Sequence, residues 1–471
     1  MKINIILNNK TYFVLLFLMG IYFRNYNINF DDLWVDEMST FWIANPSIDI
    51  LTSYKNNSSL ELSPILYNFT VRFFYIIFGY NDDYGRYVSS LFSSLSILTV
   101  SYISWLVSKN KSYLLTAFLI SLNVYLITYA QEMRLYSVVF FFVSLSILFY
   151  FKSIQQENFF NIFCFNIFIL FSILLHPFSL ILLFSIFFHI FLLIIIKKKY
   201  FKNITYSIIG IFLISIIYYF FHLNNLVPNT SDAYFFLKNP DFKFLTNMYF
   251  SKFFGSRIMG VVFLLLFLLA IQQSYKKLVK LQEISLLLIF FIFCYIIPII
   301  YGVLFHPIIA PKYIIFAIIP ITIIISNYIF NLKKYFRLLF IFLVSIMTIG
   351  NLTTEQTLKQ FFYERPVYKP EITKSLSLIN ESDYKNYFIK VDPYNNDVKI
   401  SWTFAVENYF DFLKKKYNFN IKQLNELKKI PDYLWIICIH DLNYYGCDVA
   451  ELTKHKRIDL NRVSIVLVSK E

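Results

Sequence analysis

The first 350 residues alternate between long apolar runs and short charged segments. Runs of about 17 to 25 apolar residues have the length of an α-helix that crosses a lipid bilayer, so each predicts a spanning helix. No small-residue cleavage pattern follows the first run, so we expect it to stay as an anchor rather than leave as a secretory signal. We predict eleven spans, at residues 11–23, 87–107, 112–129, 135–151, 159–175, 178–196, 203–221, 258–272, 283–301, 313–330 and 336–351.

Basic residues gather in every second loop between these runs, which is the pattern of loops that stay in the cytoplasm. The predicted cytoplasmic groups are Lys2 and Lys10, Lys109 and Lys111, Lys152, Lys197 to Lys199 with Lys202, Lys276, Lys277 and Lys280, and Lys333, Lys334 and Arg337. The N-terminus is then cytoplasmic. This arrangement requires that the short apolar segment 64–79, which contains Arg72, does not cross, and we expect it to lie at the outer leaflet as a juxtamembrane helix.

Composition supports the same class of protein. Of 471 residues, 58% are hydrophobic and 21% aromatic, more apolar surface than a soluble core could absorb. The net charge of +14 could indicate a nucleic-acid partner, but the topology accounts for the basic residues, so none is expected. The prediction is an all-α, multi-pass protein of the cytoplasmic membrane.

The composition changes to mixed charged and apolar residues from Glu371 onward. Candidate strands at 387–391, 433–440 and 463–468, with a helix over 402–417, predict a small extracytoplasmic α/β domain. We therefore divide the chain into a transmembrane domain, 1–352, whose first outer loop is 24–86, and a C-terminal domain, 353–471. Cys438 and Cys447 lie close together there, and an oxidising compartment permits a disulfide that spacing alone cannot establish.

Four carboxylates follow the first span, at Asp31, Asp32, Asp36 and Glu37. A carboxylate at the lipid–water boundary can act as a general base, because burial and neighbouring cations tune its pKa. Plain solvation is the alternative, and we prefer it for Asp31 and Asp32 but not for Asp36. No cofactor is assigned, although Asp36 could also hold a divalent metal.

Several cations stand at the predicted outer ends of spans, where the positive-inside rule does not favour them. An anionic lipid phosphate that they bind would explain their position. Snorkelling to ordinary head groups is the alternative. Two histidines that precede prolines in outer loops could line the same site or simply form turns. These residues are Arg86, Arg134, Arg257 and Lys312, with His176 and His306.

The order of these features resembles the GT-C glycosyltransferases, in particular the bacterial relatives of dolichyl-phosphate-mannose protein mannosyltransferases and the aminoarabinose lipid A transferases. The resemblance covers about the first 330 residues and rests on VDEMSTFW, SPILYNFTVRFFYIIFG, GRYVSSLFSSLSILTV, YAQEMRLYS and APKYIIFAIIP. Relatives often carry Arg where this chain has Lys312, and His where it has Ser63. The external C-terminal domain matches no motif of the family.

The resemblance implies roles for particular residues. Asp36, with Glu37 beside it, would be the catalytic base or a metal-associated carboxylate. The donor phosphate would be bound by Arg134 with Glu132 and by Lys312 with Tyr313, whereas Arg72, Arg86, His176, Arg257 and His306 are further candidates to line the site.

The implied activity is inverting transfer of a sugar from a polyprenyl-phosphate donor to a protein, lipid or glycan acceptor at the outer face. A transporter or flippase of lipid-linked glycans is an alternative, but the sequence has no inverted repeat or intramembrane chain of ionisable residues to support it. A polymerase that joins whole lipid-linked oligosaccharides is a second alternative.

Overall fold

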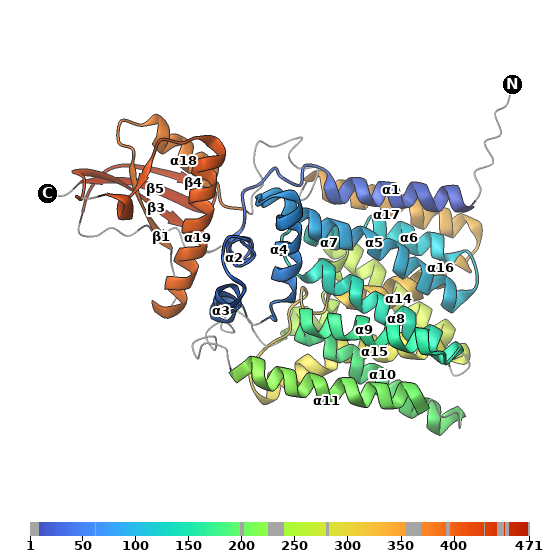
Figure 1. Cartoon of the computed structure of the whole chain (residues 1–471). Coiled ribbons are helices and arrows are strands. Elements are labelled where there is room, and N and C mark those ends of the chain that lie inside the picture. Colours follow the sequence, from blue (N-terminus) through green and yellow to red (C-terminus); the bar gives the residue numbers. More distant parts are fainter. Residues whose placement is uncertain are drawn as a thin grey trace.

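The computed structural model of the chain describes residues 9–61, 63–197, 202–224, 240–278, 282–354, 369–391, 396–427, 429–439, 447 and 452–469. It has two parts, a bundle of long helices and a smaller sheet domain at one end of that bundle (Figure 1). Lys2, Lys198, Lys199 and Lys280, which entered the topology prediction, lie outside the described residues.

The helices of the bundle coincide with the predicted apolar runs. They are α1 (Asn9–Asn25), α5 (Asp82–Ser108), α6 (Ser112–Ser121), α7 (Val124–Ala130), α8 (Tyr136–Gln155), α9 (Phe159–Leu175), α10 (Leu180–Lys197), α11 (Lys202–Asn224), α14 (Arg257–Leu278), α15 (Gln282–Leu304), α16 (Ile318–Phe330) and α17 (Lys334–Thr354), with 3-10 turns η1 (Pro177–Ser179) and η3 (Ile315–Ala317). In the described part of the chain, six helices are long and apolar enough to cross a membrane, and α6 with α7 makes up to seven. The polytopic helical fold class is confirmed, and the count of eleven spans stays a prediction.

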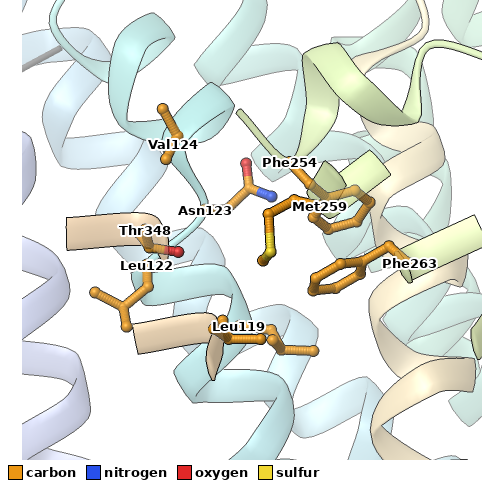
Figure 2. A pocket seen from close by; sticks show the side chains of 9 residues that line it. Leu119, Leu122, Asn123, Val124, Phe254, Met259, Phe263 and Thr348 are labelled. Atoms are coloured by element: carbon orange, nitrogen blue, oxygen red, sulfur yellow. The ribbon is translucent and has the colours of Figure 1, made fainter. Parts of the chain in front are cut away.

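The run predicted as one helix over 112–129 is broken in the structure, because α6 and α7 meet at an angle of 53°. Asn123 explains the break. Its side chain accepts a hydrogen bond from Leu126 N at 2.9 Å and so caps α7, while its Nδ2 donates to Phe253 O at 3.0 Å. A small, mostly apolar pocket lies beside the break, lined also by residues of α14 and α17 (Figure 2).

Three helices lie outside the bundle in the predicted first outer loop: α2 (Val35–Ile43), α3 (Ile50–Leu60) and α4 (Leu66–Phe78). In Figure 1, α4 runs across the bundle at the end that carries the sheet domain. It buries Val71 and Tyr75 and exposes Phe73 and Ile76. This amphipathic pattern fits a juxtamembrane helix, and its place at the outer leaflet stays a prediction. Two short helices, α12 (Phe242–Asn247) and α13 (Phe250–Phe253), precede α14.

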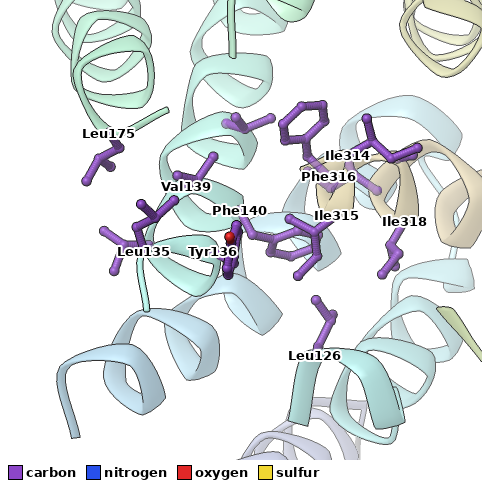
Figure 3. Close-up of a cluster of buried hydrophobic side chains, with 14 of the residues drawn as sticks. Leu126, Leu135, Tyr136, Val139, Phe140, Leu175, Ile314, Ile315, Phe316 and Ile318 are labelled. Atoms are coloured by element: carbon purple, nitrogen blue, oxygen red, sulfur yellow. The ribbon is translucent and has the colours of Figure 1, made fainter. Parts of the chain in front are cut away.

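A buried apolar cluster fixes the loops that precede α8 and η3 (Figure 3). Leu135, Tyr136 and Phe140 at the start of α8 pack with Ile314 and Ile315, and each side chain is 4% exposed or less. Close packing holds bundle helices together where lipid offers no hydrophobic driving force. The two loops that contain Arg134 and Lys312 are therefore anchored to one rigid body.

The C-terminal domain is a five-stranded mixed sheet in the order β2-β1-β3-β5-β4. Its strands are β1 (Asn386–Val391), β2 (Lys422–Gln423), β3 (Tyr433–Ile439), β4 (Thr453–Leu460) and β5 (Val463–Ser469), with helices α18 (Ile372–Glu381) and α19 (Asn396–Tyr417) and the turn η5 (Leu424–Glu426). β1 runs parallel to β2 and β3, whereas β5 is antiparallel to β3 and β4. The structure joins Cys438 to Cys447 in a disulfide, with a Cα–Cα distance of 5.6 Å.

The sheet domain packs directly on the first outer loop. Phe41 of α2 stacks on Tyr80 with ring centroids 4.2 Å apart and meets Phe412 of α19 edge-on at 5.0 Å. Lys416 pairs with Asp82 at the start of α5, at 2.8 Å. Aromatic and ionic contacts thus hold the domain on the bundle, whereas the division between residues 352 and 353 stays a prediction.

Candidate active site

Helix α2 presents two carboxylates in its first turn, and they have opposite environments. Asp36 has a side chain that is 36% exposed, while that of Glu37 is 1% exposed. Glu37 turns back to accept a hydrogen bond from Trp34 N at 2.9 Å, which caps the helix. The helix dipole favours both negative charges at this end.

Glu37 lies at the centre of a buried ionic network. Its carboxylate accepts from Arg86 Nε at 3.0 Å, from Lys369 Nζ at 3.0 Å and from Met133 N at 2.8 Å. Burial alone would raise the pKa of Glu37, but the two cations and these hydrogen bonds outweigh it and hold that pKa far below its usual range. Glu37 is therefore held in its ionised form at the centre of this network.

Arg134 joins Asp36 to a carboxylate further along the same loop. Its guanidinium forms a two-pronged pair with Glu61, at 2.6 and 3.1 Å. It also donates to the main-chain oxygen of Asp36 at 3.1 Å, and its Nη2 lies 4.0 Å from the Asp36 carboxylate. The Nε of Arg134 is buried and makes no hydrogen bond within the described residues.

Aromatic rings and a lysine form the opposite side of the site. Tyr313 packs on His176 and Phe178 with ring centroids 5.3 Å away in each case. Lys312 Nζ lies 5.7 Å from the ring centre of Tyr136 and 5.6 Å from that of Tyr313. These contacts are favourable cation–π geometry and orient the ammonium group of Lys312.

His176 is neutral in this setting. Burial lowers its pKa to about 3, and repulsion by Lys312 and Arg134 acts in the same direction. Its Nδ1 accepts a hydrogen bond from Phe178 N at 3.2 Å, so the neutral ring carries its proton on Nε2. His176 can donate one hydrogen bond to a ligand but contributes no positive charge.

Glu132 is largely buried beside the network. Burial raises its pKa to about 7, against the pull of Lys369 and Lys312, and the carboxylates of Glu37 and Asp36 add to the rise. Near neutral pH this side chain is partly protonated. A protonated carboxyl can donate a hydrogen bond to a phosphate oxygen, which suits the position predicted for it.

No protein-family model matches the chain, and no curated protein sequence does. Solved structures nevertheless superimpose on it. ArnT from Cupriavidus metallidurans in the apo state matches with a TM-score of 0.59 at 11% identity over 98% of each chain. The same enzyme bound to undecaprenyl phosphate gives 0.55 at 12% identity over 97% of each chain.

A third match is archaeal oligosaccharyltransferase AglB from Archaeoglobus fulgidus, in complex with an inhibitory peptide and a dolichol-phosphate. Its TM-score is 0.50 at 12% identity, over 91% of this chain and 69% of that one. The chain has the GT-C fold. The resemblance predicted from sequence is thus confirmed at the level of fold, and the match to ArnT extends over the sheet domain as well as the GT-C bundle.

The structure gathers seven of the predicted residues of this GT-C chain at one end of the bundle: Asp36, Glu37, Glu132, Arg134, His176, Lys312 and Tyr313. One predicted arginine, Arg86, has its donors occupied by other protein groups. Arg86 donates to the carbonyl oxygens of Ile28, Asp31 and Asp32 as well as to Glu37. It organises the first loop and, contrary to expectation, offers no free side to a lipid phosphate.

Three other predicted site-lining residues do not join the cluster. Arg72 donates to the carbonyl oxygens of Asn45, Pro46 and Ile48, and so ties the α2–α3 connection to α4. Arg257 begins α14 with an exposed side chain, and no described contact brings it to Asp36. His306 packs against Tyr301, with ring centroids 5.4 Å apart, rather than against the site.

Sequence reasoning missed two charged residues of the site. Glu61 pairs with Arg134, and the signal for it was its place two residues before Ser63 and Pro64, which open the juxtamembrane segment. Lys369 had no local signal, since its partner Glu37 is 332 positions away. Within the described residues no three His, Cys, Asp or Glu side chains are grouped to hold a metal ion, and the metal considered at Asp36 stays a hypothesis.

Proposed function

We propose that this protein is an integral-membrane glycosyltransferase that moves a sugar from a polyprenyl-phosphate donor to a hydroxyl acceptor. The observation that carries the proposal is the half-exposed Asp36 carboxylate facing Arg134, across from Lys312, at one end of a GT-C bundle. ArnT binds undecaprenyl phosphate and AglB binds a dolichol-phosphate, which supports a lipid-linked donor on this fold. In this proposal the N-terminus is cytoplasmic, and the C-terminal domain and the site lie outside.

The proposed reaction is a single displacement. Asp36 removes the proton of the acceptor hydroxyl, whose oxygen forms a bond to the anomeric carbon as the bond from that carbon to the phosphate oxygen breaks. The electron pair of the broken bond leaves with the polyprenyl phosphate, and the configuration at the anomeric carbon inverts. Lys312 and the guanidinium of Arg134 supply positive charge to the phosphate, and Glu132 in its protonated form adds a hydrogen bond.

The decisive experiment is transfer by purified protein in liposomes. A panel of polyprenyl-phosphate sugars is offered with candidate acceptors, chosen from the mass difference between cell-envelope glycans made with and without this chain. Asp36→Asn should lower the transfer rate by at least about 1000-fold, because the proton acceptor is lost. Asp49→Asn is the matched control, since Asp49 lies in the same loop, is exposed and caps α3, where Asn caps equally well.

Full activity of the Asp36→Asn protein would remove Asp36 from the proposed role. Movement of the lipid-linked sugar across the liposome bilayer, with no acceptor modified, would instead identify a flippase. Products enlarged by a whole oligosaccharide rather than one sugar would identify a polymerase.

A further inference from the structure

The segment that leads into α18 is clamped to the turn between β4 and β5. The carbonyl oxygen of Lys369 accepts from Asn461 Nδ2 at 2.7 Å. Two hydrogen bonds join Glu371 to the same asparagine: Glu371 N donates to Asn461 O at 3.1 Å, and Asn461 N donates to the Glu371 carboxylate at 2.7 Å. The backbone of Lys369 is thus held by the sheet rather than by the bundle.

The same end of the sheet domain also touches the start of the acidic loop. The guanidinium of Arg462, the residue after Asn461, lies 4.1 Å from the centre of the Trp34 ring. Thr373 N, in the first turn of α18, donates to the Asp32 carboxylate at 2.7 Å. Two contacts of the C-terminal domain are therefore made to the residues that lead into α2, the helix that carries Asp36.

A third contact of the C-terminal domain is the side chain of Lys369, which reaches Glu37 of α2. Its Nζ lies 3.0 Å from Glu37 Oε2 and is only partly accessible, with the side chain 16% exposed. The other oxygen of Glu37 accepts from Met133 N, whose chain neighbours are Glu132 and Arg134. A chain of direct contacts thus runs from the C-terminal domain to the loop that carries two site residues.

We propose that the C-terminal domain is a working part of the active site, and that Lys369 is a positioning residue that acts through Glu37 to hold the loop of Glu132 and Arg134. This inference rests on the proposed function. The Lys369–Glu37 contact also balances the charge of the site. Four carboxylates lie there with four cations: Asp36, Glu37, Glu61 and Glu132 with Arg86, Arg134, Lys312 and Lys369. Loss of Lys369 would leave four carboxylates with three cations, an unfavourable setting for an anionic donor.

The test compares three variants of the full-length protein in the liposome assay. Lys369→Met should lower the transfer rate by about 100-fold, because a small displacement of site groups has effects of that order. Lys369→Arg keeps the charge near Glu37 and should restore most of the rate. Lys385→Met, an exposed lysine of the same domain, should match wild type.

The pH dependence of the transfer rate distinguishes a positioning role of Lys369 from a general loss of folded protein. Glu132 is faced by the carboxylates of Glu37 and Asp36 and by the ammonium groups of Lys369 and Lys312. Without the Lys369 charge, the Glu132 titration should move to higher pH, and the pH dependence of the residual activity should move with it. A general loss of folded protein would lower the rate at every pH and leave the profile unshifted.

The outcomes are distinguishable from failure of the proposed function. Transfer by wild type combined with an unchanged rate and profile of Lys369→Met would overturn this inference alone, whereas absence of transfer by wild type would overturn both. If Lys369→Met does not fold, Arg462→Ala replaces it. That variant removes the contact between Arg462 and the Trp34 ring but leaves every charge of the site in place. It should lower the transfer rate less than Lys369→Met does, with no shift of the pH profile. An unchanged rate for Arg462→Ala would equally count against the inference.

Discussion

Replacement of Arg86 by methionine tests whether one buried guanidinium organises the end of the bundle that carries the sheet domain. Its side chain is 3% exposed and donates to both oxygens of Glu37, at 3.0 and 3.2 Å. It also donates to the carbonyl oxygens of Ile28 at 3.0 Å, Asp31 at 2.7 Å and Asp32 at 2.9 Å. Methionine fills a similar volume but provides none of these bonds.

The expected loss follows from these contacts. Breaking a buried ion pair by removing one partner costs about 3–5 kcal/mol, because the remaining charge is left uncompensated. Lys369 still faces Glu37 and reduces that cost, while the three carbonyl groups add roughly 1 kcal/mol each where water cannot replace the donor. Since such contributions are not additive, we expect a destabilisation of about 3–5 kcal/mol in total. Arg86→Lys keeps the charge and loses the planar fork, so its loss should be intermediate.

Thermal unfolding of the purified protein in detergent measures the effect. Because 1 kcal/mol shifts the midpoint of a 150–250-residue domain by about 2–4 °C, Arg86→Met should melt roughly 6–20 °C below wild type. Arg257→Met is the control, since Arg257 was also predicted at the outer end of a span but is exposed, and its change should stay within about 0.5 kcal/mol. If the two methionine variants melted together, the organising role of Arg86 would be refuted.

Two further predictions concern the same network. The ionised form of Glu37 is favoured in the folded state, so its contribution is complete above the ordinary glutamate pKa of about 4.3 and declines as the pH falls below that value. The difference in melting temperature between wild type and Glu37→Gln should be constant from pH 7 to 5 and narrow toward pH 3; a constant difference would contradict the assignment. In Gly85→Ala, the new methyl group would meet the buried side chains of Met133 and Tyr75, and its carbon would lie only 2.6 Å from the Tyr75 hydroxyl oxygen. This overpacking should lower the free energy of unfolding by about 1–3 kcal/mol. Gly210→Ala, with open space around it, should show no loss of melting temperature.

Local patterns predicted the bundle well, because a helix that crosses a membrane must be apolar over most of its length. The exception, the break between α6 and α7, depends on Asn123, which caps a helix from within an apolar run. In the sheet domain, β1, β3 and β5 followed from apolar content, but β4 did not. Its Lys454 to Arg457 are exposed at the edge of the sheet, where burial leaves no apolar pattern.

The candidate site was predictable where the family motifs lie and unpredictable where pairing is distant. Asp36 and Arg134 lie 4.0 Å apart and Lys312 interacts electrostatically with both, while their predicted roles stay predictions. The sequence could not show which charged side chains already pair with other groups of the protein. Arg86 looked like a phosphate ligand, and only the carbonyl groups around it reveal that its donors are used within the protein. Lys369 carries no local signature at all, since a lone lysine outside the membrane is usually a solvated one.

The ion pair between Glu37 and Lys369 has a consequence for biosynthesis. The two residues are 332 positions apart, so at a synthesis rate of about 5–20 residues per second the carboxylate waits roughly 17–66 s for its second cation. During that interval Arg86 is the cation that pairs with Glu37 among the described residues. The buried ionic network around Glu37 is therefore completed late, only after the segment that contains Lys369 has been synthesised.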